Sequence, residues 1–204
     1  GSPELDFHSR PSGVTLDEVK NRYAIPFDNY GIVVFHPVTS EADSMGKQAE
    51  ALFAALKDSE RNFVLIAPNN DPGSASILKV IATLPKNRFR MLPSMRFSHF
   101  SELMRNAAAM IGNSSAGVRE APFLGIPSLD VGTRQTNRAQ ADSICHVTAF
   151  DRGAIDTFLS QDWNKRYDRH NAFGEGSAAE RFGAVLQAPS FWAANLQKAF
   201  KDSE

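Results

Sequence analysis

A regular alternation of short apolar runs with helical segments is the feature that most constrains the fold of this chain. The runs Ile32-Val33-Val34-Phe35 and Phe63-Val64-Leu65-Ile66 are continuous and rich in β-branched residues, which is typical of strands buried on both faces of a sheet. Between them, apolar residues recur at helical spacing over residues 39–58. Strands that alternate with helices form parallel βαβ units, so the sequence predicts an α/β fold with a doubly wound parallel sheet.

The remaining segments extend this pattern along the chain. Further strands are predicted at residues 89–92, 108–111, 127–131 and 146–149. Further helices are predicted from Thr15 to Pro26, from a cap at Ser98 to residue 107, and at residues 77–84, 115–124, 154–159, 178–186 and 191–200. Ligands of such sheets bind beyond the carboxyl ends of the strands, where His36, Asn69 and the turn at residues 112–115 are expected.

Composition limits the functional classes open to the chain. Its 204 residues are expected to form one large domain or one domain with appended pieces, and the 42% hydrophobic content supports a core. The net charge of −1 gives no basic field for nucleic acid or an anionic membrane surface, and no apolar stretch reaches the roughly 18 residues of a membrane span. The single cysteine, Cys145, excludes an internal disulfide framework, is expected to be buried on a strand, and favours a cytoplasmic location.

The turn after the predicted strand at residues 108–111 is the most informative candidate site. It runs Gly112-Asn113-Ser114-Ser115 and opens a short helix in which Glu120 lies about one turn further on. Unpaired backbone N–H groups at such a turn favour a phosphate, the serines add hydroxyl donors, and the carboxylate can accept hydrogen bonds from a ribose diol. This spacing indicates a nucleoside diphosphate site, but a serine cap followed by an acidic first turn has the same pattern in many helices.

Four motifs follow one another along the chain: Phe35–Glu41, Pro68–Ser74, Gly112–Pro122 and Gly132–Gln135. Together they resemble the UDP-N-acetylglucosamine 2-epimerase family, and the resemblance runs from about Thr15 to about residue 188. The Phe-His-Pro-Val-Thr pattern of the first motif differs from the Gly-His-Arg-Arg pattern of the non-hydrolysing branch. The resemblance therefore favours the hydrolysing branch, which makes N-acetylmannosamine for sialic-acid-type sugars.

This resemblance implies two Rossmann-like domains with the nucleotide in the cleft between them, the glycosyltransferase-B arrangement. The chain is similar to the C-terminal half of such an enzyme. Residues 1–14 are then expected to be the interdomain connection or a tag remnant, residues 15–188 the UDP-binding domain, and residues 189–204 a crossover helix. The crossover helix would pack on an N-terminal domain, which in the family supplies acidic residues for proton transfer. Family members usually form dimers or larger assemblies, so a homo-oligomer is expected.

In the family, UDP is eliminated from the sugar to leave a glycal, and water or UDP then adds with the opposite configuration at C2. The resemblance implies that His36 is catalytic and lies near the diphosphate, where a protonated ring could hold the β-phosphate or assist its departure. Ser114 and Ser115 match the phosphate-binding hydroxyls of the family, and Glu120 matches its ribose-binding carboxylate. The family chemistry needs no metal and no cofactor.

Three further residues have both a functional and a structural interpretation. Arg134 can pair with phosphate or sugar oxygens, or with a carboxylate in a surface salt bridge. Phe100 is expected to cover the uracil ring and fits the family position better than Phe97, although one of the two rings is expected to be plain core. Asn69 can reach the sugar or a phosphate, or it can complete a turn after its strand.

The implied ligands are UDP and a UDP-N-acetylhexosamine, either UDP-N-acetylglucosamine or a diacetamido-deoxy relative. Two other functions stay open from the sequence. One is the C-terminal domain of a glycosyltransferase-B transferase, which would require an acceptor-binding domain upstream. The other is a non-catalytic UDP-sugar-binding module, against which the joint presence of His36, Glu120 and Arg134 argues.

Overall fold

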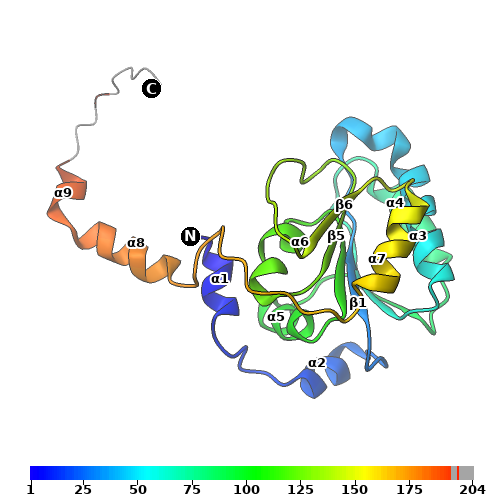
Figure 1. The fold of residues 1–204 in the computed structure, drawn as a ribbon, viewed down its shortest axis with the longest axis horizontal. Helices are drawn as coiled ribbons and strands as arrows, with labels where there is room; N and C mark the ends of the chain where they lie inside the picture. The colour runs from blue at the N-terminus through cyan, green and yellow to red at the C-terminus, as the bar shows by residue number, and fades with distance from the viewer. Residues whose placement is uncertain (194–196, 198–204) are drawn as a thin grey trace.

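Six parallel strands form a single sheet in the computed structural model, which describes residues 1–193 and Gln197 (Figure 1). The strands are β1 (Gly31–Val34), β2 (Phe63–Ile66), β3 (Phe89–Leu92), β4 (Ala109–Gly112), β5 (Ser128–Val131) and β6 (Ile144–Val147). Their spatial order is β3-β2-β1-β4-β5-β6, and every pair is parallel. The predicted doubly wound parallel sheet is therefore confirmed.

The direction of winding reverses between β1 and β4. The chain first moves outward from β1 to β2 and β3, then returns to β4 and continues to β5 and β6. β1 and β4 are paired in register, with Val34 opposite Gly112. A crevice forms at such a switch point beyond the carboxyl ends of the two strands, and ligands of open α/β sheets bind there.

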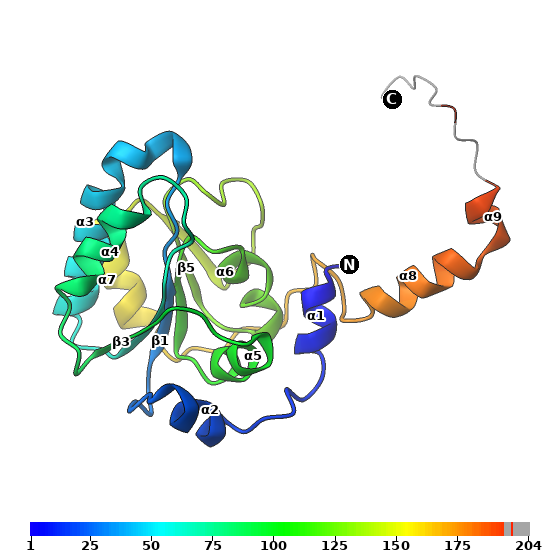
Figure 2. The same cartoon turned by 180° about the vertical axis from the view of Figure 1, so that it is seen from behind.

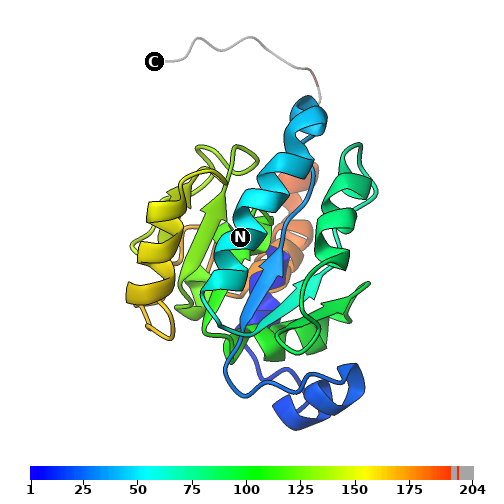
Figure 3. The same cartoon turned by 90° about the vertical axis from the view of Figure 1, so that its right-hand side faces the viewer.

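Helices cover both faces of the sheet (Figures 1 and 2). The α-helices are α1 (Pro3–His8), α2 (Leu16–Tyr23), α3 (Met45–Asp58), α4 (Ser74–Ala82), α5 (Phe97–Arg105), α6 (Ser115–Arg119), α7 (Arg152–Gln161), α8 (Ala178–Gln187) and α9 (Pro189–Trp192), and the 3-10 helices are η1 (Thr39–Ser44) and η2 (Pro122–Leu124). α3, α4 and α7 lie on one face, seen in front of the sheet in Figure 3, while α2, α5 and α6 pack on the other. Among the described helices, none is long and apolar enough to cross a membrane.

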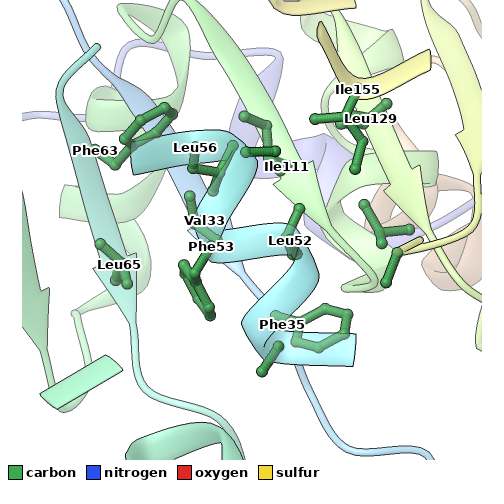
Figure 4. Packing of buried hydrophobic residues seen from close by; sticks show 14 of the residues in the cluster. Val33, Phe35, Leu52, Phe53, Leu56, Phe63, Leu65, Ile111, Leu129 and Ile155 are labelled. Carbon is green, nitrogen blue, oxygen red and sulfur yellow. The ribbon is translucent and has the colours of Figure 1, made fainter. Parts of the chain in front are cut away.

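The larger core lies between the sheet and α3. Leu52, Phe53 and Leu56 of α3 are at most 1% exposed and pack on strand residues such as Val33 and Ile111 (Figure 4). Burial of each such side chain stabilises the fold by about 1.5–3 kcal/mol. This packing confirms the predicted apolar face of the helix and fixes the positions of β1 and β4, whose ends carry the candidate site.

Three helix predictions needed correction, the first being that over residues 39–58, where Thr39–Ser44 form the 3-10 helix η1 and the α-helix begins at Met45. The helix predicted at residues 115–124 ends at Arg119, and a 3-10 turn begins at Pro122, because proline has no N–H to continue the helical hydrogen bonds. Ser98 does not cap α5, since the helix begins at Phe97 with Arg96 in the extended cap position. The helix predicted at residues 191–200 falls mostly outside the described residues, which show α9 ending at Trp192.

The first residues of the chain form a docked helix rather than an open connection. α1 buries Leu5 and His8 to 1% exposure and contacts α5, η2 and α8. The Asp6 carboxylate accepts hydrogen bonds from the N–H groups of Ala178 and Ala179, each at 2.7 Å, and so caps α8. From this cap, α8 and α9 extend away from the sheet (Figure 1).

Candidate functional site

Asn113 joins the ends of β1 and β4 at the switch point. The residue is 1% exposed, and its Oδ1 accepts a hydrogen bond from the His36 N–H at 2.7 Å. Its Nδ2 donates to the His36 carbonyl oxygen at 2.8 Å. These paired bonds fix the backbone that carries the His36 ring. The sequence analysis included Asn113 in the candidate turn but gave its side chain no role.

Gly112 allows the two strands to come this close. Its φ is +121°, a conformation that side chains rarely adopt. A Cβ at this position would collide with the Val34 carbonyl oxygen. Only glycine can therefore end β4 where it passes β1 and turns toward Ser114.

The His36 ring is half-buried and already has one partner. Its Nδ1 accepts a hydrogen bond from the Asn69 N–H at 3.1 Å, so the neutral ring carries its proton on Nε2. Burial, and then the positive charge of Arg134, lower the pKa of His36 below its usual value, against a smaller opposing effect of Asp71. This shift favours the neutral imidazole, whereas the resemblance implied a ring that could be protonated near the diphosphate.

The fourth sequence motif reaches the same point from β5. The Arg134 guanidinium donates to the Asn113 carbonyl oxygen at 3.3 Å, and the Gln135 amide donates to the same oxygen at 2.8 Å. Among the described residues, no carboxylate lies within ion-pair distance of Arg134, so the surface salt bridge that was the alternative does not form. Gln135, which is 1% exposed, is a second residue that the sequence analysis missed.

The two serines lie beside this cluster. Ser114 caps α6, with its Oγ accepting from the Ala116 N–H at 3.3 Å, and both Ser114 and Ser115 are half-buried. Asn69 donates its side-chain amide to Asp71 at 2.5 Å, which is the turn-completing role that was one of its two interpretations. The structure therefore gathers His36, Asn69, Ser114 and Arg134 around one end of the sheet.

Glu120 lies at the C-terminal end of α6 and contacts α1 rather than the cluster around His36. It follows the last helical residue and is 8% exposed. Its Oε2 accepts a hydrogen bond from His8 Nε2 at 2.6 Å, and His8 Nδ1 is 2.8 Å from Ser101 Oγ. The carboxylate is therefore held by the first helix of the chain, an arrangement with no signal in the sequence.

Of the two phenylalanines considered for the base, Phe100 packs against the core on the α5 face of the sheet. Phe97 is 39% exposed, and its ring lies 5.3 Å from the His8 ring, next to the Glu120 pair. The Phe97 ring also lies 5.2 Å from the Phe7 ring, and it is the more exposed of the two candidate rings.

Other features of the structure lie apart from this cluster. Cys145 is on β6 as predicted, is half-buried rather than buried, and has a pKa raised by burial. A hollow of about 650 Å³ lies at the opposite, amino-terminal edge of the sheet, near Ser143 and Arg166. Nowhere in the part of the chain that the structure describes do three metal-ligating side chains gather to hold an ion.

Comparisons with known proteins agree with this architecture. The family model described as UDP-N-acetylglucosamine 2-epimerase matches residues 1–187. A Neisseria meningitidis protein named UDP-N-acetylglucosamine 2-epimerase is 41% identical over 205 residues, covering 99% of this chain and 54% of that protein. A Legionella pneumophila protein named UDP-N,N'-diacetylbacillosamine 2-epimerase (hydrolyzing) is 29% identical over 191 residues, covering 92% and 50% of the two chains. The chain thus spans about half the length of these relatives.

Solved structures show the same fold. The UDP-GlcNAc 2-epimerase of Methanocaldococcus jannaschii in complex with UDP-GlcNAc and UDP matches with a TM-score of 0.71 and 14% identity, over 91% of this chain and 53% of that chain. The Neisseria meningitidis UDP-GlcNAc 2-epimerase bound to UDP-GlcNAc matches with a TM-score of 0.67 and 16% identity, over 83% of this chain and 48% of that chain.

Proposed function

The chain belongs to the UDP-N-acetylglucosamine 2-epimerase family, and from this premise we propose that it forms the UDP-binding half of a hydrolysing 2-epimerase. The observation that carries the proposal is the convergence of His36, Ser114 and Arg134 at the switch point of the sheet, tied together by Asn113. These three donors follow three different strands and gather at one edge of the sheet, an arrangement that suits the oxygens of a diphosphate.

The proposed reaction converts UDP-N-acetylglucosamine and water into N-acetylmannosamine and UDP. The bond between C1 and the diphosphate oxygen breaks, a proton leaves C2, and water later adds to the resulting glycal. Negative charge grows on the departing diphosphate, and fixed donors lower the barrier when they are aimed at that charge. Arg134 supplies a full positive charge, and the neutral His36 supplies an Nε2–H donor.

Other residues are proposed to hold the remainder of the nucleotide. The hydroxyls of Ser114 and Ser115 bind phosphate oxygens, and Glu120 accepts hydrogen bonds from the ribose. Phe97 is proposed to lie against the uracil ring, since it is the more exposed ring and contacts His8, the partner of Glu120, while Phe100 is partly buried against the core. Asn69 contributes its backbone N–H to the His36 ring rather than a contact to the sugar.

The proton acceptor and the sugar pocket are proposed to come from a second domain. An exposed apolar surface on α8 and α9, formed by Phe182, Val185, Phe191 and Trp192, supports packing of these helices on that domain. A homo-oligomer and a cytoplasmic location remain predictions, testable by light scattering and by cell fractionation.

Calorimetric titration of the full-length gene product with UDP, UMP and ADP tests this function. We expect UDP to bind more tightly than ADP, and His36→Ala to weaken UDP more than uridine. His170→Ala, which removes a histidine at the opposite edge of the sheet, is the matched control and should leave both affinities unchanged. Equal affinity for UDP and ADP would contradict the proposal. UDP binding without formation of N-acetylmannosamine would point to the non-catalytic alternative.

A further inference from the structure

A chain of three buried polar side chains joins α1, α5 and Glu120. Ser101 on α5 is 0% exposed, His8 at the end of α1 is 1% exposed, and Glu120 is 8% exposed. Ser101 Oγ lies 2.8 Å from His8 Nδ1, and His8 Nε2 lies 2.6 Å from Glu120 Oε2. Burying a polar group costs free energy unless it has a hydrogen-bond partner. Each of these three side chains has one, which indicates that their arrangement serves a purpose.

We propose that His8 is a positioning residue that holds the Glu120 carboxylate in place for the nucleotide ribose. The inference rests on the proposed function, since it takes Glu120 to be the ribose acceptor. His8 Nδ1 is held by the Ser101 hydroxyl, and a proton on Nε2 is donated to Glu120 Oε2. Among the described residues, Glu120 Oε1 makes no hydrogen bond, which leaves this oxygen for a ribose hydroxyl.

Contacts from neighbouring elements to helix α1 fix the position of His8. The Arg105 guanidinium donates to the His8 carbonyl oxygen and to the Arg10 carbonyl oxygen, the latter at 2.8 Å. The Arg119 guanidinium, one residue before Glu120, lies 3.2 Å from Glu4. α1 is therefore clamped at both ends to the elements that carry the site, so its imidazole can act as a rigid support.

The same helix connects the ribose acceptor with the end of the chain. Asp6 caps α8 through two backbone N–H groups at 2.7 Å, two residues before His8. The Asp6 cap therefore connects α8 directly to α1, the helix that carries His8. The geometry therefore links the placement of Glu120 to the helices proposed to contact the second domain.

Ribose discrimination in the full-length protein tests this role. The unaltered protein should bind UDP more tightly than 2′-deoxy-UDP by about tenfold or more, the range for a hydrogen bond to a charged group. His8→Ala should reduce this preference to less than about threefold. His8→Gln, whose amide can still donate to Glu120, should restore most of it, and His170→Ala should leave it unchanged.

Each contrary result overturns the inference. If His8→Ala keeps the full preference while its melting temperature falls, His8 only stabilises the fold. If His8→Ala binds UDP more tightly, His8 competes with the ribose instead of supporting its acceptor. Should His8→Ala fail to fold, Ser101→Ala carries the test, because an unchanged preference there would refute the chain of contacts. Equal binding of UDP and ADP by the unaltered protein would overturn the proposed function as well. If the unaltered protein prefers UDP over ADP, the variants test only the role of His8.

Discussion

Replacement of Asn113 by Ala tests how the site is held together. Asn113 is 1% exposed, and the variant removes both of its hydrogen bonds to the His36 backbone. A buried group that loses its partner costs about 1–3 kcal/mol. Since His36 is only half-buried, water can replace part of the loss, and we expect the free energy of unfolding to fall by about 2–4 kcal/mol. For a domain of this size, the melting temperature should fall by about 4–16 °C.

The assay is thermal and urea unfolding, followed by UDP titration at a temperature where the variant is folded. Asn106→Ala is the matched control, because the Asn106 amide donates to the Glu102 carbonyl oxygen on an exposed surface. This control should change stability by no more than about 0.5 kcal/mol. If the free energy of unfolding of N113A also changes by no more than about 0.5 kcal/mol, Asn113 does not hold the two strand ends together, and the reasoning is refuted.

Asn113→Asp refines the same test through its pH dependence. The aspartate keeps an acceptor for the His36 N–H but sets a second oxygen against the His36 carbonyl oxygen. This contact is repulsive while the carboxyl is ionised, and protonation restores a donor. The destabilisation by N113D should therefore be smaller at a pH near the ordinary aspartate pKa of about 4 than at neutral pH.

Three further predictions concern single residues. Gly112→Ala should prevent folding or cost about 3 kcal/mol or more, because its Cβ meets the Val34 carbonyl oxygen, whereas Gly183→Ala, in open space on α8, should be neutral or slightly stabilising in the same melting assay. Burial raises the pKa of the Asp130 carboxyl, so the folded state favours its protonated form. The resulting contribution to stability is present below about pH 4 and is lost as the pH rises through the raised pKa. Asp130→Asn should accordingly raise the melting temperature more at neutral pH than near pH 4. In UDP titrations, His36→Gln should bind better than His36→Ala, because only Gln keeps a side-chain donor.

The sheet could be predicted because several of its strands are short apolar runs that must be buried. Ile32-Val33-Val34-Phe35 and Phe63-Val64-Leu65-Ile66 have no polar side chain to expose, so they fit only the middle of a covered sheet. Once the strands are parallel, the residues after them share one edge. This rule brought together His36, Asn69 and the turn at residues 112–115 without knowledge of any particular contact, whereas Arg134 was added from the family resemblance.

The contacts within that edge could not be predicted in the same way. Asn113 and His36 are 77 positions apart, and nothing in the local pattern distinguishes an asparagine that bridges two strands from one that only turns the chain. The helix at Pro3–His8 is a similar case, because six residues carry too little periodicity to predict a helix and its stability comes from docking on α5. His8 and Glu120 meet only after that docking, 112 positions apart.

The hydrogen bond to Nδ1 decides how His36 can take part in the reaction. A second proton on the ring would have to sit on Nδ1, where it would face the Asn69 N–H that donates to this atom. Protonation therefore breaks a contact between β1 and β2, and burial beside Arg134 opposes it further by lowering the pKa. A neutral ring has no charge to offer the diphosphate, but its Nε2–H is held in a fixed direction by the Asn69 and Asn113 contacts. In the proposed reaction, His36 would therefore act on the departing UDP as an oriented hydrogen-bond donor, and Arg134 would supply the positive charge.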